Sequence, residues 1–460
     1  MMIQQKKQNE NYKFKRLANL SILALLILEL ISCTTDKNVS DYEKTIAPSP
    51  TTVKKHYNYP ERIILTWKNN PATSQAVTWR TDASVSQAFA EIALADPSPN
   101  FGKNSEKCQA ETTEIYTEDG LVNYHSVNFI NLLPQSLYAY RVSSGEIWSE
   151  WFHFRTANNR PDPFLFIYLG DAQDEIFSLW SRVVRSAYSY APKASFMIHG
   201  GDLVNQANSD QQWSEWFKAG GWIFAMMPSI PVVGNHEYEK DKNNDYRVSK
   251  YWRPQFMLPE HLAGGLEELV YYIDYQGVRI IALDSDSDKR LIDQARWLED
   301  LLKDNPNKWT IVTFHHPIFS STKKRDNKIL RNLWKPIFDK YKVDIVLQGH
   351  DHIYARGRNL QNNRTLFNYE SGTMYIVSVS GPKMYKLDPN RWMDRAAENT
   401  QLFQVISITK NTLHYEAVTV TGELYDSFDL IKREGASNLL VEKISPEVPE
   451  RTFQSTSKVR

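Results

Sequence analysis

The chain has few cysteines and no surplus of charge of either sign. Only two cysteines, Cys33 and Cys108, occur among its 460 residues, so a disulfide scaffold and a zinc site built from thiolates are both excluded. Its 54 basic residues balance its 54 acidic residues, which leaves no electrostatic basis for a nucleic acid as the main partner. Any bound metal ion must therefore be held by oxygen and imidazole nitrogen.

Long apolar runs are also scarce, and the one near the start of the chain is a poor membrane span. Basic residues precede an apolar stretch over residues 17–32, which is the order found in a secretory signal. The stretch is shorter than a bilayer-spanning helix needs and contains Glu29. The sequence therefore predicts an exported protein.

The apolar stretch ends in Leu30-Ile31-Ser32-Cys33, which resembles the lipobox of bacterial lipoproteins. The resemblance implies a signal peptide over residues 1–32 and a lipid on Cys33, which anchors the protein to a lipid bilayer of the bacterial cell envelope. Thr34, rather than Asp, follows the cysteine and favours the outer membrane. An uncleaved anchor or a chance cysteine is the alternative interpretation.

The next residues divide into a linker and a region of short strands. Residues 33–55 contain almost nothing apolar and are rich in Thr, Ser, Pro and charge, which predicts a flexible tether. Over residues 56–157, short apolar runs alternate with turn-rich pieces, which predicts an all-β antiparallel sandwich. Strands are expected at residues 63–67, 76–79, 88–94, 124–130, 137–143 and 151–155.

From residue 161 the pattern changes to that of an α/β domain. Nearly continuous apolar runs alternate with amphipathic helical patterns over residues 161–432, which indicates a sheet covered on both faces. The runs are residues 163–169, 194–198, 231–233, 278–283, 309–314, 343–347 and 374–379, and helices are expected around 176–187, 292–302 and 330–338. Residues 433–460 are interpreted as a polar tail.

Polar residues gather where the apolar runs of this domain end. Gly-Asp follows two runs, at Asp171 and Asp202, and Gly-Asn-His-Glu follows a third run, at residues 234–237. Residues 315–317 (His-His-Pro) and 349–352 (Gly-His-Asp-His) follow two more. A single Gly-Asp is most often a turn, but ligand sites of α/β folds gather at the carboxyl ends of strands. Five such pieces at five strand ends therefore predict a functional site.

The residue types in these pieces suit a metal centre. Carboxylate, amide oxygen and imidazole come from six positions: Asp171, Asp202, Asn235, His315, His350 and His352. These donors suit iron, manganese or zinc, and the lack of thiolate excludes an iron–sulfur cluster. Six ligands are too many for one open catalytic ion and suit two ions that share a carboxylate. Two ions about 3.5–4 Å apart acidify a water and stabilise the oxygens of a phosphoester during in-line displacement.

The order Gly-Asp, Gly-Asp, Gly-Asn-His-Glu, His-x-Pro, Gly-His-x-His resembles that of the calcineurin-like metallophosphoesterases. In the sandwich, Trp67, Trp79 and residues 138–141 resemble the fibronectin type III-like domain that precedes the catalytic domain of purple acid phosphatases. The resemblance to that branch implies a four-layer α/β domain, in which two mixed sheets pack face to face and are flanked by helices.

The resemblance also implies a role for each residue of the site. Asp202 would bridge two ions, and the other ligands fall into two groups: Asp171 and His352 on the first ion, and Asn235, His315 and His350 on the second. His236 would be the catalytic residue, either as the proton donor to the leaving oxygen or as a stabiliser of the transition state.

One position departs from the purple branch. There, a tyrosine three residues after the bridging aspartate binds the ferric ion, whereas this chain has Asn205. An amide is a weaker and neutral donor, so the identity of the metals, the colour and an acid pH optimum do not follow from the resemblance. Asn205 and His316 are candidates for contact with the substrate or for packing behind the ligands.

Two other polar segments have simpler interpretations. Asp351 is expected to point away from the histidines that flank it, since successive side chains of an extended segment face opposite sides. Residues 238–251 are strongly charged and are interpreted as a solvated loop near the site.

The sequence therefore predicts an exported, lipid-anchored, acid phosphatase-like enzyme that hydrolyses phosphate monoesters by attack of a metal-activated hydroxide. Its expected partners are a small phosphate ester and the lipid bilayer, with no nucleic acid. One alternative is a phosphodiesterase or nucleotide hydrolase that uses the same metal site. The alternative of another class is a catalytically inert surface binding lipoprotein, which intact ligands at all six positions disfavour.

Overall fold

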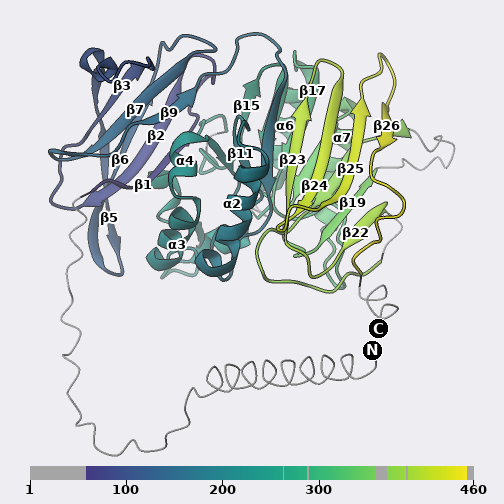
Figure 1. Cartoon of the computed structure of the whole chain (residues 1–460). Helices are drawn as coiled ribbons and strands as arrows, with labels where there is room; N and C mark the ends of the chain where they lie inside the picture. Colours follow the sequence, from purple (N-terminus) through teal and green to yellow (C-terminus); the bar gives the residue numbers. More distant parts are fainter. Residues whose placement is uncertain (1–58, 263, 287–289, 359–369, 390–391, 453–460) are drawn as a thin grey trace, which may run out of the picture. The chain divides into compact units, whose positions relative to one another are not determined.

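The computed structural model describes residues 59–452, apart from residue 263 and residues 287–289, 359–369 and 390–391. The predicted signal peptide, Cys33 and the tether lie outside the described residues. Within the described part of the chain, no helix is long and apolar enough to cross a membrane. A β-sandwich is followed along the chain by an α/β domain (Figure 1).

The first domain consists of antiparallel strands in two sheets. One sheet has the order β1-β2-β6-β5, and the other has the order β4-β3-β7-β8, with β9 paired to β7. Trp79 is fully buried in the core between them and donates its indole N–H to the carbonyl of Ser143, so its polar edge is satisfied. The predicted all-β sandwich is confirmed, and its likeness to fibronectin type III stays a prediction. The elements are β1 (Glu61–Thr66), β2 (Gln75–Asp82), β3 (Phe89–Leu94), the 3-10 turn η1 (Phe101–Asn104), β4 (Glu106–Gln109), β5 (Glu111–Thr117), β6 (Gly120–Phe129), β7 (Leu137–Ser144), β8 (Ile147–Trp148) and β9 (Phe152–Arg155).

The second domain contains two large mixed sheets. The eight-stranded sheet has the order β12-β11-β10-β23-β24-β25-β26-β20, and the seven-stranded sheet has the order β15-β16-β17-β18-β21-β19-β22. Strands β10, β11 and β12 are parallel, as are β16, β17, β18 and β21. The predicted α/β class with two mixed sheets is confirmed. The strands are β10 (Phe164–Leu169), β11 (Met197–His199), β12 (Ser229–Pro231), β13 (Tyr238–Lys240), β14 (Tyr246–Val248), β15 (Tyr271–Tyr275), β16 (Val278–Ala282), β17 (Trp309–Thr313), β18 (Ile345–Gln348), β19 (Tyr354–Arg358), β20 (Glu370–Ser371), β21 (Met374–Val377), β22 (Arg395–Ala397), β23 (Leu402–Ile408), β24 (Thr412–Thr419), β25 (Leu424–Ile431) and β26 (Asn438–Glu442).

Helices accompany both sheets. Helix α2 packs against β23 and α3, and α6 packs against α7 (Figure 1). The three predicted helices correspond to η2 with α2, to α6 and to α7, whereas α3, α4 and α5 are not among the predicted helices. The helical elements are the π-helical turn η2 (Ile176–Trp180), α2 (Ser181–Tyr190), α3 (Asp210–Gly220), α4 (Trp222–Met226), the 3-10 turn η3 (Asn235–Glu237), α5 (Trp252–Gln255), α6 (Leu291–Lys303) and α7 (Lys328–Tyr341).

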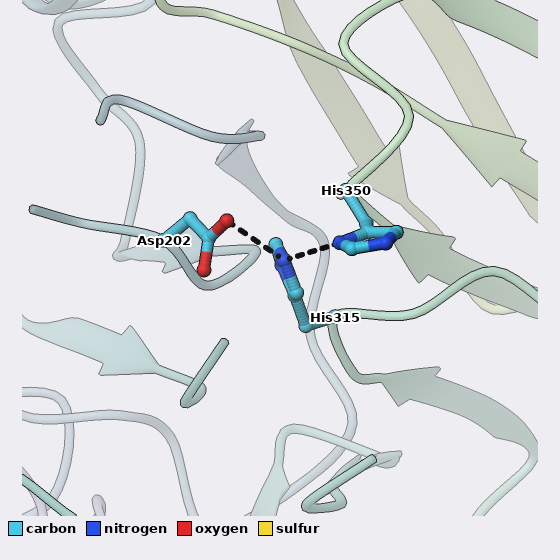
Figure 2. Close-up of side chains that lie close together, drawn as sticks. All are labelled: Asp202, His315 and His350. Carbon is cyan, nitrogen blue, oxygen red and sulfur yellow. Dashed lines mark hydrogen bonds and ion pairs between the residues drawn. The ribbon is translucent and has the colours of Figure 1, made fainter. Parts of the chain in front are cut away.

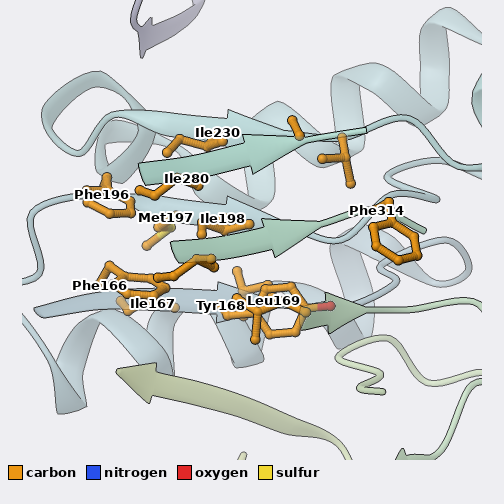
Figure 3. Close-up of a cluster of buried hydrophobic side chains, with 14 of the residues drawn as sticks. Phe166, Ile167, Tyr168, Leu169, Phe196, Met197, Ile198, Ile230, Ile280 and Phe314 are labelled. Atoms are coloured by element: carbon orange, nitrogen blue, oxygen red, sulfur yellow. The ribbon is translucent and has the colours of Figure 1, made fainter. Parts of the chain in front are cut away.

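The parallel strands form the centre of the hydrophobic core. Figure 3 shows Ile198 and Ile230 of the first sheet in one cluster with Ile280 of the second, and all three side chains are essentially inaccessible to solvent. Burial on both faces explains why these strands are continuous apolar runs in the sequence rather than alternating ones.

The structure corrects two details of the predicted organisation. The polar tail predicted for residues 433–460 is wrong over residues 438–442, because these form β26, which pairs with both β25 and β20. The strand predicted at residues 231–233 lies earlier, at Ser229–Pro231, where it pairs in parallel with β11.

Candidate metal centre

The site lies where polar residues follow parallel strands of both sheets. Asp171 follows β10 and Asp202 follows β11, so both leave the same edge of the first sheet. His315 and His350 follow the parallel neighbours β17 and β18 of the second sheet. The two edges meet, since the backbone N–H of His350 donates to Oδ1 of Asp171 at 2.8 Å.

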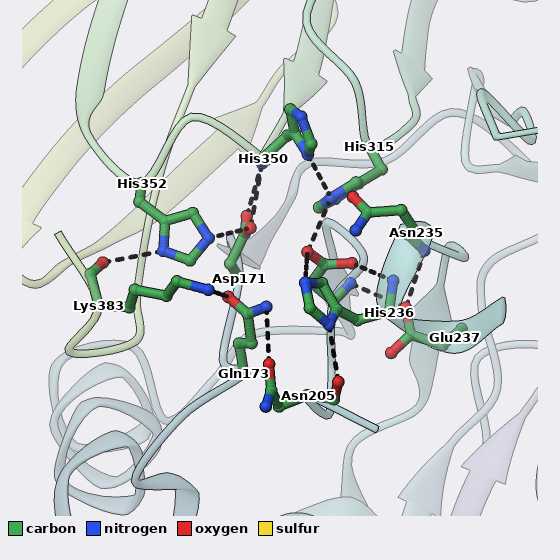
Figure 4. A network of polar contacts seen from close by, with 12 residues as sticks. Asp171, Gln173, Asn205, Asn235, His236, Glu237, His315, His350, His352 and Lys383 are labelled. Carbon is green, nitrogen blue, oxygen red and sulfur yellow. Dashed lines mark hydrogen bonds and ion pairs between the residues drawn. The ribbon is translucent and has the colours of Figure 1, made fainter. Parts of the chain in front are cut away.

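One group of potential ligands consists of Asp171, Asp202 and His352, whose ligand atoms all lie within 4.8 Å of one another. Nε2 of His352 lies 3.2 Å from Oδ2 of Asp171. The other ring nitrogen, Nδ1, donates to the carbonyl oxygen of Lys383 at 2.9 Å (Figure 4). That hydrogen bond fixes the ring so that Nε2 faces the carboxylate.

A second group consists of Asp202, His315 and His350 (Figure 2). Nε2 of His315 lies 3.1 Å from Oδ2 of Asp202 and 3.2 Å from Nδ1 of His350. Nδ1 of His315 donates to the carbonyl of Gly200 at 2.9 Å. Asp202 belongs to both groups, which is the arrangement that a bridging carboxylate requires.

The electrostatics of these groups favour a cation. Burial acts to lower the pKa of His315, but the carboxylates of Asp202 and Asp171 outweigh burial and raise that pKa to about 10. Burial and the neighbouring His316 lower the pKa of His350, so this imidazole is neutral, the form that binds metals. Negative potential at one imidazole and a neutral imidazole beside it suit a metal ion between them.

Asn235 adds a further donor. Its Oδ1 is buried and has no hydrogen-bond partner in the described part of the chain, although buried polar atoms are rarely left unpaired. Figure 4 shows this amide beside His315. All six predicted ligands are therefore brought together and fit a metal centre, while the assignment of each ligand to an ion stays a prediction.

The backbone around the ligands explains the glycines of the motifs. A Cβ atom at Gly349 would overlap Oδ1 of Asp171, and one at Gly234 would overlap Oδ1 of Asp202. Asp202, His350 and His352 have φ angles of 50°, 69° and 39°, a region that costs non-glycine residues free energy and is common at functional sites.

Glu237 is a component of the site that the sequence prediction missed. It is fully buried, and its carboxylate accepts the backbone N–H groups of Asp202, Leu203 and Gly234 at 2.8 Å and of Val204 at 3.2 Å. It therefore holds the loop that carries Asp202 against the loop that carries Asn235. Its only signal in the sequence is its place in the Asn-His-Glu motif.

His236 lies beside the ligand groups and belongs to neither of them. Its Nδ1 donates to the carbonyl of Asn205 at 2.7 Å, and its Nε2 lies 3.9 Å from Oδ2 of Asp202. The side chain is 29% exposed, so it can reach a molecule that enters the site.

Asn205 is connected to the rim of the site. Its Oδ1 accepts a hydrogen bond from Gln173 at 3.2 Å, and Oε1 of Gln173 accepts one from Nζ of Lys383 at 3.2 Å (Figure 4). The side-chain oxygen of Asn205 is therefore directed to Gln173.

The remaining predicted neighbours lie as follows. His316 packs its ring 4.2 Å from that of His350, and burial lowers its pKa to about 3. The carboxylate of Asp351 accepts hydrogen bonds from Ser320 and Ser321, so it is directed to a neighbouring loop. Residues 238–251 contain the hairpin β13–β14, and Tyr246 of this hairpin donates to the carbonyl of Asn235 at 3.3 Å.

Comparison with known proteins indicates the same two domains, in the same order along the chain. Residues 60–156 match the purple acid phosphatase N-terminal domain, and residues 164–354 match the calcineurin-like phosphoesterase family. Phosphoenolpyruvate phosphatase of Allium cepa is 25% identical over 72% of this chain and 70% of its own length. Fe(3+)-Zn(2+) purple acid phosphatase 12 of Arabidopsis thaliana is 24% identical over 71% of each chain.

A solved structure supports the fold. Purple acid phosphatase PPD1 from yellow lupin (Lupinus luteus) seeds superposes with a TM-score of 0.70, covering 82% of this chain and 75% of that one at 19% identity. Fold, motifs and matches together define a metal-dependent phosphoric ester hydrolase. The chain therefore contains a purple acid phosphatase N-terminal domain followed by a calcineurin-like metallophosphoesterase domain.

Proposed function

We propose that this chain is a dinuclear phosphatase that hydrolyses phosphate monoesters. The observation that carries the proposal is the membership of Asp202 in both ligand groups, since a carboxylate shared between two ions is what a two-metal site needs. When bound, the two ions supply a nucleophilic water and neutralise charge on the phosphate oxygens.

The ligands divide between the ions according to the two groups. Asp171 and His352 would hold one ion, Asn235, His315 and His350 would hold the other, and Asp202 would bridge them. The unpartnered Oδ1 of Asn235 supports its place in this set.

His236 is proposed to donate the proton to the leaving oxygen. Its Nδ1 is engaged by the carbonyl of Asn205, so Nε2 is the atom that holds and transfers the proton. A positioned proton donor contributes about 10²–10⁴-fold to the rate. His236→Ala should therefore keep its metal content and lose activity, most strongly for poor leaving groups.

The metals are proposed to be divalent ions of iron, manganese or zinc. No phenolate stands at the position of Asn205, so the protein should be colourless or faintly yellow, and Asn205→Tyr should shift the site toward iron. A purple wild-type protein whose visible absorption disappears on reduction would contradict this proposal.

The proposed function is tested by loading the metal-free chain with each ion and assaying phenyl phosphate and diphenyl phosphate. Metal-dependent hydrolysis that is faster for the monoester supports the proposal. Faster hydrolysis of the diester favours a phosphodiesterase or nucleotide hydrolase. Metal binding without hydrolysis of either ester supports an inert surface binding lipoprotein.

The protein is further proposed to act at the cell envelope, anchored through a lipid on Cys33, because Leu30-Ile31-Ser32-Cys33 resembles a lipobox. Cys33→Ser should abolish labelling with radioactive palmitate and leave the protein unprocessed or soluble after export. Equal labelling of the wild type and the variant would contradict the proposed lipid on Cys33.

A further inference from the structure

Two loops beside the ligand histidines carry basic side chains that the proposed chemistry does not use. One loop follows His315 and the other follows β21, and they meet where the backbone N–H of Asp388 donates to the carbonyl of Ser321 at 2.8 Å. Their basic residues are Lys323, Lys324, Arg325, Lys383 and Lys386.

Tyr385 connects Arg325 to the metal ligands. The Tyr385 ring lies 4.5 Å from the ring of His352, and the guanidinium of Arg325 lies 4.7 Å from the centre of the same tyrosine ring. Arg325 also donates to the Tyr385 hydroxyl at 3.3 Å and to the carbonyl of His350 at 2.9 Å. This cation is therefore next to a ligand of each proposed ion.

Arg325 is partly exposed although it has several partners within the protein. Asp351 is fully buried, and its Oδ1 lies 3.7 Å from Nη1 of Arg325, whereas its Oδ2 accepts hydrogen bonds from Ser320 and Ser321. The Arg325 side chain remains 33% exposed. A partly exposed guanidinium held in this way is suited to binding an oxyanion through charge-assisted hydrogen bonds.

Lys383 supplies a second cation at the same ring. Its Nζ lies 6.0 Å from the centre of the Tyr385 ring, and Figure 4 shows its side chain beside His352 and directed toward Gln173. Its nearest acceptor is the neutral Oε1 of Gln173, and the carboxylate of Asp174 is 3.8 Å away on a 39% exposed side chain. The charge of Lys383 is thus only weakly compensated, because exposed ion pairs contribute little.

We propose that Arg325 and Lys383 form an anion subsite beside the metal centre, and that the preferred substrates carry a second phosphate or a carboxylate in addition to the phosphoester. This inference rests on the proposed function. An incoming oxyanion takes the place of Gln173 on Lys383 and pairs with Arg325 through charge-assisted hydrogen bonds. Lys323 and Lys324, which are exposed, add attraction at longer range.

The subsite is tested with phenyl phosphate and with its para-carboxylate and para-phosphate derivatives, all on the metal-loaded enzyme. Charge-assisted hydrogen bonds predict a gain of about tenfold in kcat/KM for a derivative over phenyl phosphate, expressed mainly in KM. Lys383→Met and Arg325→Met should each reduce this gain severalfold, where the gain of each variant is measured against its own kcat/KM on phenyl phosphate. A gain for the para-phosphate derivative alone would show that the subsite binds phosphate. A gain for both derivatives would show that it accepts phosphate and carboxylate alike.

Lys410→Met is the matched control. Lys410 is exposed and lies two residues after Ile408. Ile408 pairs with Phe164 at the start of β10, whereas Asp171 follows the other end of that strand. This variant should retain the full gain. Added salt should reduce the gain in the wild type, since part of the attraction acts through solvent.

Two results would overturn the inference, and they differ from failure of the proposed function. If phenyl phosphate is hydrolysed and kcat/KM is equal for the three substrates, the proposed subsite is contradicted while the proposed phosphatase activity is retained. If phenyl phosphate is not hydrolysed, phenylphosphonate and its para-phosphonate derivative are titrated into the metal-loaded protein instead. If the para-phosphonate derivative binds more tightly than phenylphosphonate and Lys383→Met abolishes this difference, the result supports the subsite. Equal affinity of the wild type for the two compounds contradicts it.

Discussion

At the scale of single residues, Glu237 organises the centre without belonging to either ligand group. Replacing it with Ala leaves four buried N–H groups without an acceptor, each of which costs about 1–3 kcal/mol when unpaired. Glu237→Ala should therefore lower both the free energy of unfolding and the metal content, and Glu237→Gln should do so less. Glu239→Gln, which changes an exposed carboxylate that accepts from Asn208, is the control, and metal analysis with thermal denaturation gives the readout.

One result would contradict this role of Glu237. A Glu237→Ala variant with wild-type metal content would mean that the loops of Asp202 and Asn235 hold their positions without this carboxylate.

Glu268 predicts a pH dependence of stability. Burial raises its pKa to about 7, whereas the unfolded chain releases this proton near a pKa of about 4.3. The folded state thus binds more protons between these values, so the contribution of Glu268 to stability falls as the pH rises through this window. Glu268→Gln should be more stable than the wild type at pH 8, by a free energy on the order of 1 kcal/mol, and equal to it near pH 4.

Urea unfolding at the two pH values measures this difference. The adjacent Glu267 is the control, because hydrogen bonds from backbone N–H groups, its own first, lower its pKa. Glu267→Gln should therefore lose stability at pH 8. The same sign for both variants would contradict the assignment.

The ligands themselves were predictable because each stands where a buried strand ends. Asp171 and His315 lie within two residues of the ends of apolar runs, and although one such residue is most often part of a turn, five groups of them at five strand ends indicate a ligand site. Glu237 and Lys383 were not predictable in their roles, because their partners are backbone groups and side chains of distant loops, which a local pattern does not encode.

At the scale of elements, β26 gives the sharpest test. It is a short strand in a polar segment, yet Leu440 is only 5% exposed and lies in the main core, and Glu442 forms an ion pair with Arg356. Leu440→Ala should cost about 2–5 kcal/mol of unfolding free energy, the usual range for a buried leucine. Val441→Ala, at a half-buried position, should cost less.

Denaturant unfolding of the two variants checks the prediction. A Leu440→Ala variant as stable as the wild type would restore the interpretation of this segment as a tail.

Comparison of β26 with the central strands shows which strands a sequence pattern can predict. Strands β10 and β17 were predictable because burial on both faces produces continuous apolar runs. Strand β26 was not, because its apolar run of three residues, Leu439 to Val441, is too short to give a periodic signal, and its pairing with β25 and β20 depends on the rest of the sheet.

At the scale of the whole molecule, a buried ion cluster joins the sandwich to the α/β domain. Arg62 of β1 and Arg80 of β2 both bind the carboxylate of Asp210, at the start of α3, with N–O distances of 2.7–2.9 Å. Asp210→Asn leaves two buried guanidinium groups without this charge partner. It should lower the free energy of unfolding by about 3–5 kcal/mol, the usual cost of breaking a buried pair.

Calorimetry gives the result, with Asp241→Asn as the control, because Asp241 pairs with an exposed Arg247 and its loss should change nothing measurable. The Asp210 variant should also lose activity, since Gln212 of α3 accepts the backbone N–H of Asn205, whose carbonyl holds His236. Wild-type stability and activity in Asp210→Asn would mean that this ion cluster does not stabilise the contact between the two domains.

The central claim is that two ions share Asp202 and together support phosphoester hydrolysis. It is tested most directly by titrating metal into the metal-free protein while phenyl phosphate hydrolysis is followed. We expect activity to saturate at about two ions per chain, and we expect Asp202→Asn to bind metal poorly and remain inactive. Saturation at one ion per chain, or full activity in Asp202→Asn, would contradict the account.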